Sequence, residues 1–95
     1  MEEIKVGYKE NLYEGIPDEL RQCVEELAEN VHKKWAEEKT RQGWIYGSHR
    51  DDVKKTSPCL IPYDSLPEHE KDYDRVTAVE TIKFLLDNGY KIIKS

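Results

Sequence analysis

The chain has 95 residues, which is enough for one small domain over residues 1–95 but leaves little room for a deep enzyme cleft. Apolar and charged residues each make up 37% of the sequence, so part of the charge must lie on solvated helix faces. The formal net charge of −5 argues against a nucleic-acid polymer or an anionic membrane as partner. No apolar run approaches the ~18 residues of a membrane span, and we expect no leader peptide at the start of the chain. We therefore expect no membrane insertion and a cytoplasmic location.

A long amphipathic helix is predicted from Pro17 to a point between Lys39 and Gln42. Proline suits the first turn of a helix, and Asp18 places a negative charge at the positive end of the helix dipole. Gly43 then ends the helix, because glycine readily adopts the left-handed backbone that stops one. Between these ends, apolar residues recur at spacings of three and four and form one stripe: Leu20, Val24, Leu27, Ala28, Val31 and Trp35.

The second half of the chain is predicted to hold a further, shorter set of helical elements. Residues 43–64 are expected to be irregular, with residues 59–61 as a short extended segment between two prolines. The spacing from Ser65 to Glu68 is that of a capping box and predicts a short helical turn over residues 66–72. A longer helix is expected from near Asp74 to Asn88, and its apolar stripe consists of Val76, Val79, Ile82, Leu85 and Leu86.

Apolar residues at the two chain ends are compatible with a small β-ribbon. Ile4, Val6 and Tyr8 alternate within an extended arm of residues 1–16, and residues 90–93 carry the second candidate strand. We therefore predict a mainly α fold of two main antiparallel helices plus a short helical turn. The two-stranded ribbon would then be formed by the chain ends.

Five runs of residues form a pattern in a fixed order. They are LAENVHKKWA at residues 27–36, GWIYGSHRDD at 43–52 with PCL at 58–60, LPEHEKDY at 66–73 and ETIKFLLDNGY at 80–90. Their order and spacing, over about residues 16–93, resemble the ryanodine receptor repeat, or RyR domain. Ser57 stands where that family commonly has a histidine before the proline, so no role is carried over to this position.

The resemblance implies a mostly helical module that is not an enzyme. In the large calcium-release channels such repeats occur as tandem pairs outside the pore. Single copies occur in small prokaryotic proteins, which is the type that this chain resembles. Nucleotide binding is a role suggested for the family, and no catalytic residue is known for it.

Aromatic and basic side chains near the end of the first helix are the first candidates for a ligand site. Trp44 and Tyr46 either close the small core over that helix end or offer their rings for stacking on a purine base. In the second case Arg50, with Lys54 and Lys55, would supply positive charge for a phosphate group.

Two further features leave alternatives open. Trp35 belongs either to the core or to a pocket wall or dimer contact, and His32 lies beside it at the edge of the apolar stripe. A homodimer with two-fold symmetry would bring two copies of Trp35 face to face around a flat ligand. Arg50 with residues 51–52 forms either an ion-pair clasp that orders the loop or a contact to an anionic ligand, with the two acids holding Mg²⁺.

No constellation for catalysis or metal binding is found in the sequence. It has no phosphate-binding glycine loop, its histidines lack zinc-site spacing, and Cys23 and Cys59 are expected to be reduced packing residues. The charged residues at 68–75 are expected to be solvated, with a few weak pairs. We therefore expect no enzymatic activity, no cofactor and no metal site.

The leading hypothesis is a non-enzymatic module that binds a small, flat, anionic ligand such as an adenine nucleotide. The residues assigned to this ligand are Trp35, Trp44, Tyr46, Arg50, Lys54 and His32. The alternative is a protein–protein interaction or oligomerisation module without a small-molecule ligand, in which the same aromatic rings belong to the core or to an interface.

Overall fold

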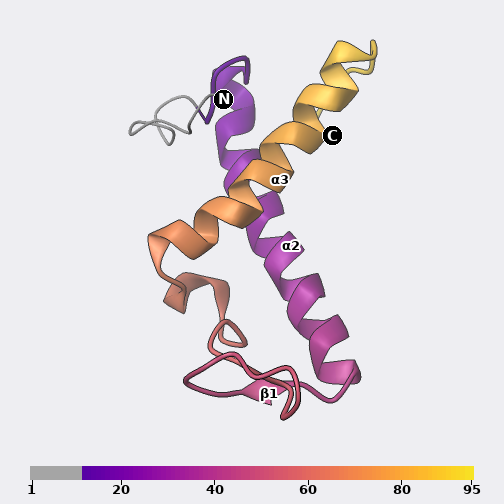
Figure 1. The fold of residues 1–95 in the computed structure, drawn as a ribbon. Coiled ribbons are helices and arrows are strands. Elements are labelled where there is room, and N and C mark those ends of the chain that lie inside the picture. The colour runs from indigo at the N-terminus through magenta and orange to yellow at the C-terminus, as the bar shows by residue number, and fades with distance from the viewer. Residues whose placement is uncertain (1–11) are drawn as a thin grey trace, which may run out of the picture.

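The computed structural model describes residues 12–95 and is built on two long helices that cross each other (Figure 1). A 3₁₀ turn, η1 (Asp18–Leu20), leads directly into α2 (Arg21–Arg41), and α3 (Glu68–Asp87) returns antiparallel to it. Between the helices lie β1 (Ile45–Tyr46), β2 (Thr56–Ser57) and a second 3₁₀ turn, η2 (Tyr63–Ser65). The prediction of a mainly α fold with two antiparallel helices is confirmed.

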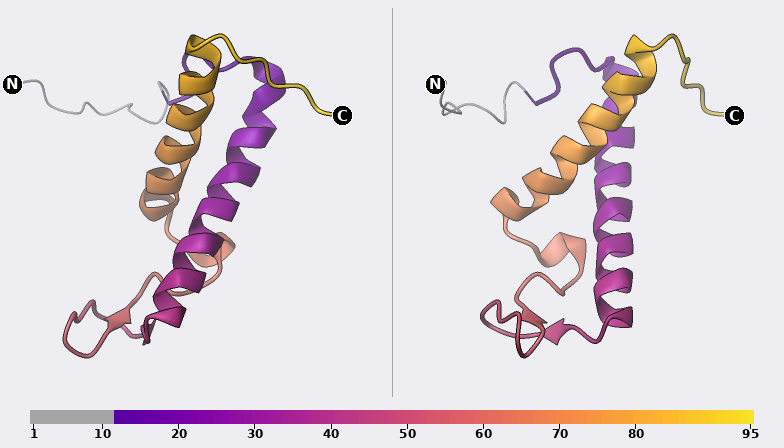
Figure 2. Two further views of the ribbon diagram at one scale, coloured as in Figure 1. Left: turned by 90° about the vertical axis from the view of Figure 1, so that its right-hand side faces the viewer. Right: turned by 45° about the vertical axis from the view of Figure 1, so that its right-hand side comes forward.

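The two helices are offset along their length (Figure 2). The first half of α2 packs against α3, whereas its second half extends beyond α3 toward the segment that carries β1. This segment, residues 43–62, is called the central loop below. The offset leaves one face of the second half of α2 to be covered by the central loop instead of by a helix.

The core lies between the facing sides of α2 and α3, at their crossing. It is small because a chain of this length buries little of its surface. Its buried residues combine the predicted helix stripes with side chains from the flanking turns: Leu12, Ile16, Val24, Ala28, Tyr63, Leu66, Ala78, Val79 and Ile82.

The predicted ends of the first helix are confirmed. Pro17 stands immediately before η1, and the positive φ of +94° at Gly43 places that residue in the left-handed region after α2. The amide of Gly43 donates to the carbonyl of Thr40 at 3.0 Å, and the amide of Trp44 donates to that of Lys39 at 3.0 Å. This is the Schellman pattern of helix termination, which requires a residue such as glycine at the left-handed position.

The second helix is one continuous element, whereas the sequence predicted a turn over 66–72 and a separate helix from Asp74. No residue between Glu68 and Asp87 breaks the helical pattern, and Pro67 supplies the extended backbone from which the helix starts. The predicted capping box does not form, because Ser65 belongs to η2 and no side chain caps α3. The short helical turn is present, but it lies at Tyr63–Ser65.

The small two-stranded sheet is also present, but it is formed within the central loop. β1 and β2 pair in parallel, with Ile45 opposite Thr56 and Tyr46 opposite Ser57. Residues 59–61 and 90–93, which were expected to be extended segments or strands, form no strand. The other half of the expected ribbon, at Ile4, Val6 and Tyr8, lies outside the described residues.

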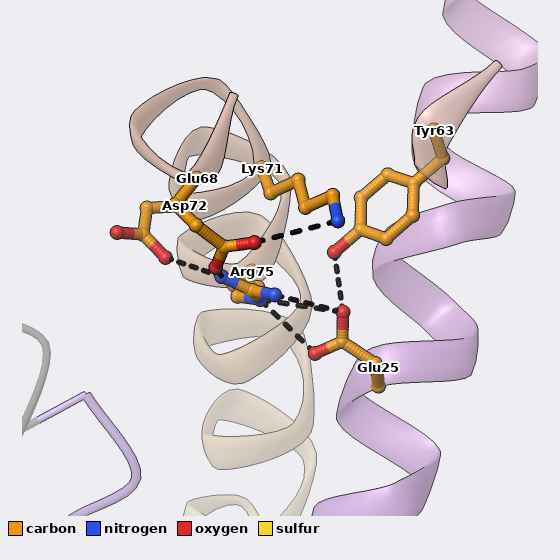
Figure 3. Close-up of polar contacts among 6 residues, drawn as sticks. All are labelled: Glu25, Tyr63, Glu68, Lys71, Asp72 and Arg75. Atoms are coloured by element: carbon orange, nitrogen blue, oxygen red, sulfur yellow. Dashed lines mark hydrogen bonds and ion pairs between the residues drawn. The ribbon is translucent and has the colours of Figure 1, made fainter. Parts of the chain in front are cut away.

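A buried arginine connects the two helices (Figure 3). The side chain of Arg75 in α3 donates to both carboxylate oxygens of Glu25 in α2, with Nε at 3.0 Å from Oε2. Its Nη1 donates to Asp72 at 2.8 Å and to Glu68 at 2.9 Å, and the hydroxyl of Tyr63 donates to Glu25 at 2.6 Å. The expectation of solvated charges over residues 68–75 is therefore wrong for Arg75, which is only 8% exposed.

This cluster is held in its charged form. Burial by itself raises the pKa of Glu25, but the hydrogen bonds from Arg75 and Tyr63 outweigh it and keep the pKa below the ordinary value of 4.5. Burial and the neighbouring Glu25 carboxylate raise the pKa of Tyr63. The hydrogen bonds to Glu25 likewise raise the pKa of Arg75, so the ion pair persists over the whole physiological range.

Within residues 12–95, neither long helix combines the length and the apolar character that crossing a membrane requires.

Candidate functional site

An open groove lies between the second half of α2 and the central loop. Its volume is about 820 Å³, and its helical wall presents Lys33, Ala36 and Thr40, which follow one another at helical spacing on one face. The opposite wall is formed by residues 44–46 and 60–63. The groove lies where α2 extends beyond α3, so that the central loop instead of a helix faces α2 there.

Trp44 lines this groove but is buried and in contact with two cations. It is 9% exposed, and the ammonium of Lys39 lies 4.5 Å from the centroid of its ring. The guanidinium carbon of Arg50 lies 5.5 Å from the same centroid. These cation–π contacts favour the structural interpretation of Trp44, since they occupy the ring that a purine would need.

Tyr46 and Ile45 have the opposite character. The short strand β1 leaves both side chains largely exposed, at 57% and 63%, while they also line the groove. The aromatic face that is accessible in the groove is therefore that of Tyr46, and Ile45 adds an apolar surface beside it.

A second, smaller hollow lies on the other side of the His32 ring. Its volume is about 380 Å³, and it is lined by Trp35 from α2, by Tyr73 and Asp74 from α3 and by Arg50 from the central loop, among others. His32 lines both hollows and is the wall that they share.

His32 is buried and joins three parts of the fold. Its Nε2 donates to the carbonyl of Ile61 at 2.7 Å, because a carbonyl oxygen can only accept. Its Nδ1 faces Oδ2 of Asp74 at 3.7 Å, and its ring stacks on that of Trp35 with 5.5 Å between centroids. The expected position of His32 at the edge of the stripe beside Trp35 is confirmed.

The acidic residues that follow Arg50 order the central loop. Nε of Arg50 donates to Asp52 at 2.9 Å in an exposed pair. Oδ1 of Asp51 accepts from the amides of Val53 at 2.9 Å and Lys54 at 3.0 Å, which is the side-chain turn that aspartate favours. These contacts match the clasp interpretation of residues 50–52 rather than a magnesium site.

The structure divides five of the six predicted site residues between the two hollows. Trp44 and Tyr46 line the larger groove, Trp35 and Arg50 line the smaller hollow, and His32 lines both. Lys54 is exposed and lines neither hollow. The six residues therefore do not line one common hollow.

Sequence reasoning missed several lining residues. Lys33 and Ile45 stand next to residues that the motifs singled out, so their position in the chain was a usable signal. Tyr73 and Asp74 had no such signal, because only the crossing of α3 over α2 brings them to Trp35.

Cys23 and Cys59 are free thiols, and burial raises the pKa of Cys59. In the described part of the chain, no three histidine, cysteine or acidic side chains are grouped to hold a metal ion.

Comparison with known families identifies the family of this chain. Residues 14–94 match the family model of the RyR domain. The match includes both helices, the central loop and both hollows, and it coincides with the motifs recognised over about residues 16–93. The chain belongs to the RyR domain family.

Proposed function

We propose that this RyR domain is a recognition module that binds a small, flat, anionic ligand, with an adenine nucleotide as the first candidate. The observation that carries the proposal is the groove of about 820 Å³, which combines the exposed ring of Tyr46 with the ammonium of Lys33. A purine base needs an aromatic face, and its phosphate needs a cation at a short distance from that face.

The charges around the groove are compatible with such a ligand. Two acids, Glu29 and Glu37, also line it, but both are exposed on α2. Glu37 is moreover paired with Lys34 at 3.3 Å, so solvent and a counter-ion screen its charge. Lys39, on the Trp44 ring, adds a cation next to the groove. The proposed activity is binding without catalysis, and it requires no cofactor.

The test is a titration of the full chain with ATP, ADP and a cyclic nucleotide, followed by two-dimensional NMR. We expect saturable shifts of the amides of residues 44–46 at millimolar or lower nucleotide. Tyr46→Ala and Lys33→Ala should each weaken binding by about tenfold, as expected for one stacking ring or one charge-assisted contact. Phe84→Ala, which removes an exposed ring outside the groove, is the matched control and should leave affinity unchanged.

The nucleotide proposal is rejected if the folded wild type shows no shift at millimolar nucleotide. It is also rejected if Tyr46→Ala binds as well as the wild type.

The second candidate function is protein–protein interaction, including formation of a homodimer. The observation that favours it is the exposure of apolar side chains on the central loop at Ile45, Tyr46 and Val53. Light scattering during size-exclusion chromatography tests the homodimer directly. A monomer at high concentration, both with and without nucleotide, would exclude it.

A further inference from the structure

The smaller hollow has a chemistry that the nucleotide proposal does not use. Its aromatic walls are the rings of Trp35, Tyr73 and His32, and two carboxylates from the first turns of α3, Glu70 and Asp74, also face it. Aromatic faces together with carboxylates form the usual surroundings of a bound organic cation, because both attract positive charge. An anionic ligand would be repelled by the same groups.

Asp74 is the most informative of these residues. Its side chain is only 18% exposed, and within residues 12–95 the one group that partners its carboxylate is Nδ1 of His32, at 3.7 Å. That distance is longer than a hydrogen bond. Nε2 of His32 already donates to the carbonyl of Ile61, and no group among residues 12–95 donates a hydrogen bond to the Asp74 carboxylate.

The electrostatics agree with this geometry. Burial raises the pKa of Asp74, the nearby Glu70 carboxylate raises it further, and His32 only partly opposes them. A cation placed between the two carboxylates would offset both the effect of burial and the effect of Glu70 on the pKa of Asp74.

Arg50 does not supply the missing charge, although it lines the same hollow. Its guanidinium is bound to the carboxylate of Asp52 at 2.9 Å and lies against the ring of Trp44. Its side chain is 66% exposed, so it stands at the rim and is turned toward the central loop. The interior of the hollow remains acidic and aromatic.

We propose that this hollow binds a small organic ammonium ion, held between the rings of Trp35 and Tyr73 and the carboxylates of Asp74 and Glu70. A volume of about 380 Å³ admits a compact head group such as trimethylammonium together with a short tail. The site is separate from the nucleotide groove, shares only its His32 wall with it, and selects the opposite charge.

The experiment compares choline with 3,3-dimethyl-1-butanol, a neutral molecule of the same shape. Each is titrated into the full chain in two-dimensional NMR at constant ionic strength, with sodium chloride as the salt control. The chain has two tryptophans, so the indole N–H signals of Trp35 and Trp44 report separately on the two hollows. We expect choline to shift the Trp35 signal saturably in the millimolar range, and the neutral analogue to shift it at least about fivefold more weakly.

Variants identify the carboxylates. Asp74→Asn and Glu70→Gln keep the side-chain size but remove the charge, and each should weaken choline binding by about fivefold or more. Tyr46→Ala is the matched control from the larger groove and should leave choline binding unchanged. It should weaken nucleotide binding by about tenfold, so failure of one proposal can be told from failure of the other.

The proposal is overturned if choline and its neutral analogue shift Trp35 equally, or if neither shifts it. It is also overturned if both Asp74→Asn and Glu70→Gln, each shown by NMR to be folded, bind choline as the wild type does.

Discussion

At the scale of single residues, two polar side chains connect separate elements of the fold, which the sequence did not indicate. Arg75 joins α2 to α3, and His32 joins α2 to the central loop and to α3. Helical spacing places Arg75 on the face of Ala78, Val79 and Ile82, so its burial was within reach of sequence reasoning. Its partner Glu25 lies 50 residues earlier in the chain, and no local pattern pairs residues at that separation.

The first prediction concerns the contribution of the Arg75 cluster to the stability of the fold. Arg75→Met keeps most of the side-chain volume but removes the donors to Glu25 and Asp72. We expect a loss of about 2 kcal/mol in the free energy of unfolding, less than for a fully buried pair because Glu25 is partly exposed. Urea denaturation followed by circular dichroism measures it.

Arg41→Met is the matched control for this change. Arg41 pairs with Glu38 on the exposed face of α2, where both side chains are at least half exposed. Such surface pairs contribute little, so the control should change the free energy of unfolding by less than about 0.5 kcal/mol. Equal losses in the two variants would contradict the assignment of Arg75 as the connection between the helices.

The second prediction is the acid response of Glu25. Its pKa is lowered in the folded state, so its contribution to stability is present above the ordinary value of 4.5 and is lost as the pH falls through the folded value. Glu25→Gln lacks this contribution at every pH. The difference in melting temperature between wild type and variant should therefore be large at about pH 6 and shrink toward about pH 3. A difference that is independent of pH would contradict it.

At the scale of elements, the sequence correctly predicted the features that depend on residues close together in the chain. Pro17 and Gly43 mark the ends of the first helix, because a proline start and a left-handed glycine stop act within one turn. The break expected before Asp74 was wrong, since α3 continues through it and Arg75 bonds back to Asp72 within the same helix. The sheet was placed at the wrong residues, because pairing between two-residue strands leaves no alternation to detect.

The third prediction tests the close approach of β1 and β2. A methyl group on Gly47 would lie 2.6 Å from Cβ of Thr56 and 3.1 Å from its Cγ2 and Oγ1, closer than such atoms approach in proteins. Gly47→Ala should therefore cost about 2 kcal/mol and move the backbone of β1, including Tyr46. Thermal denaturation gives the first effect, and the amide shifts of residues 44–47 give the second.

A double variant provides the control. In a Thr56→Gly background the atoms that the new methyl group would meet are absent, so adding Gly47→Ala should cost much less than in the wild type. Additive losses would show that the effect of the methyl group does not arise from Thr56.

At the scale of the whole molecule, both hollows follow from the offset between the helices. The apolar stripe of α2 runs from Leu20 to Trp35, whereas that of α3 begins only at Val76, so the sequence shows that the stripe of α2 is the longer one. The sequence does not show which residues cover the part of α2 that lies beyond α3. The sequence joined Trp35, Trp44 and Tyr46 in one site, whereas the path of the central loop places them on two sides of His32.

The fourth prediction is that this division also separates two levels of local stability. The core cluster takes its side chains from the two helices and the turns beside them, with none from residues 43–57. The amide of Ile45 makes one hydrogen bond, to Lys55 across the two-residue sheet, and the amide of Thr56 makes one, to Asp51 in an isolated bridge. Segments with few buried contacts open at a lower free energy than the core.

In native-state hydrogen exchange, the amides of Ile45, Gly47 and Thr56 should therefore exchange through local opening, while those of Ala28 and Val79 exchange only on global unfolding. A nucleotide bound in the larger groove contacts β1 in the folded state alone, so it should slow exchange of the central loop before it affects the core. Equal opening free energies for the two sets would contradict the division. The central loop would then unfold with the helices as one unit, and a ligand in either hollow would stabilise the whole domain.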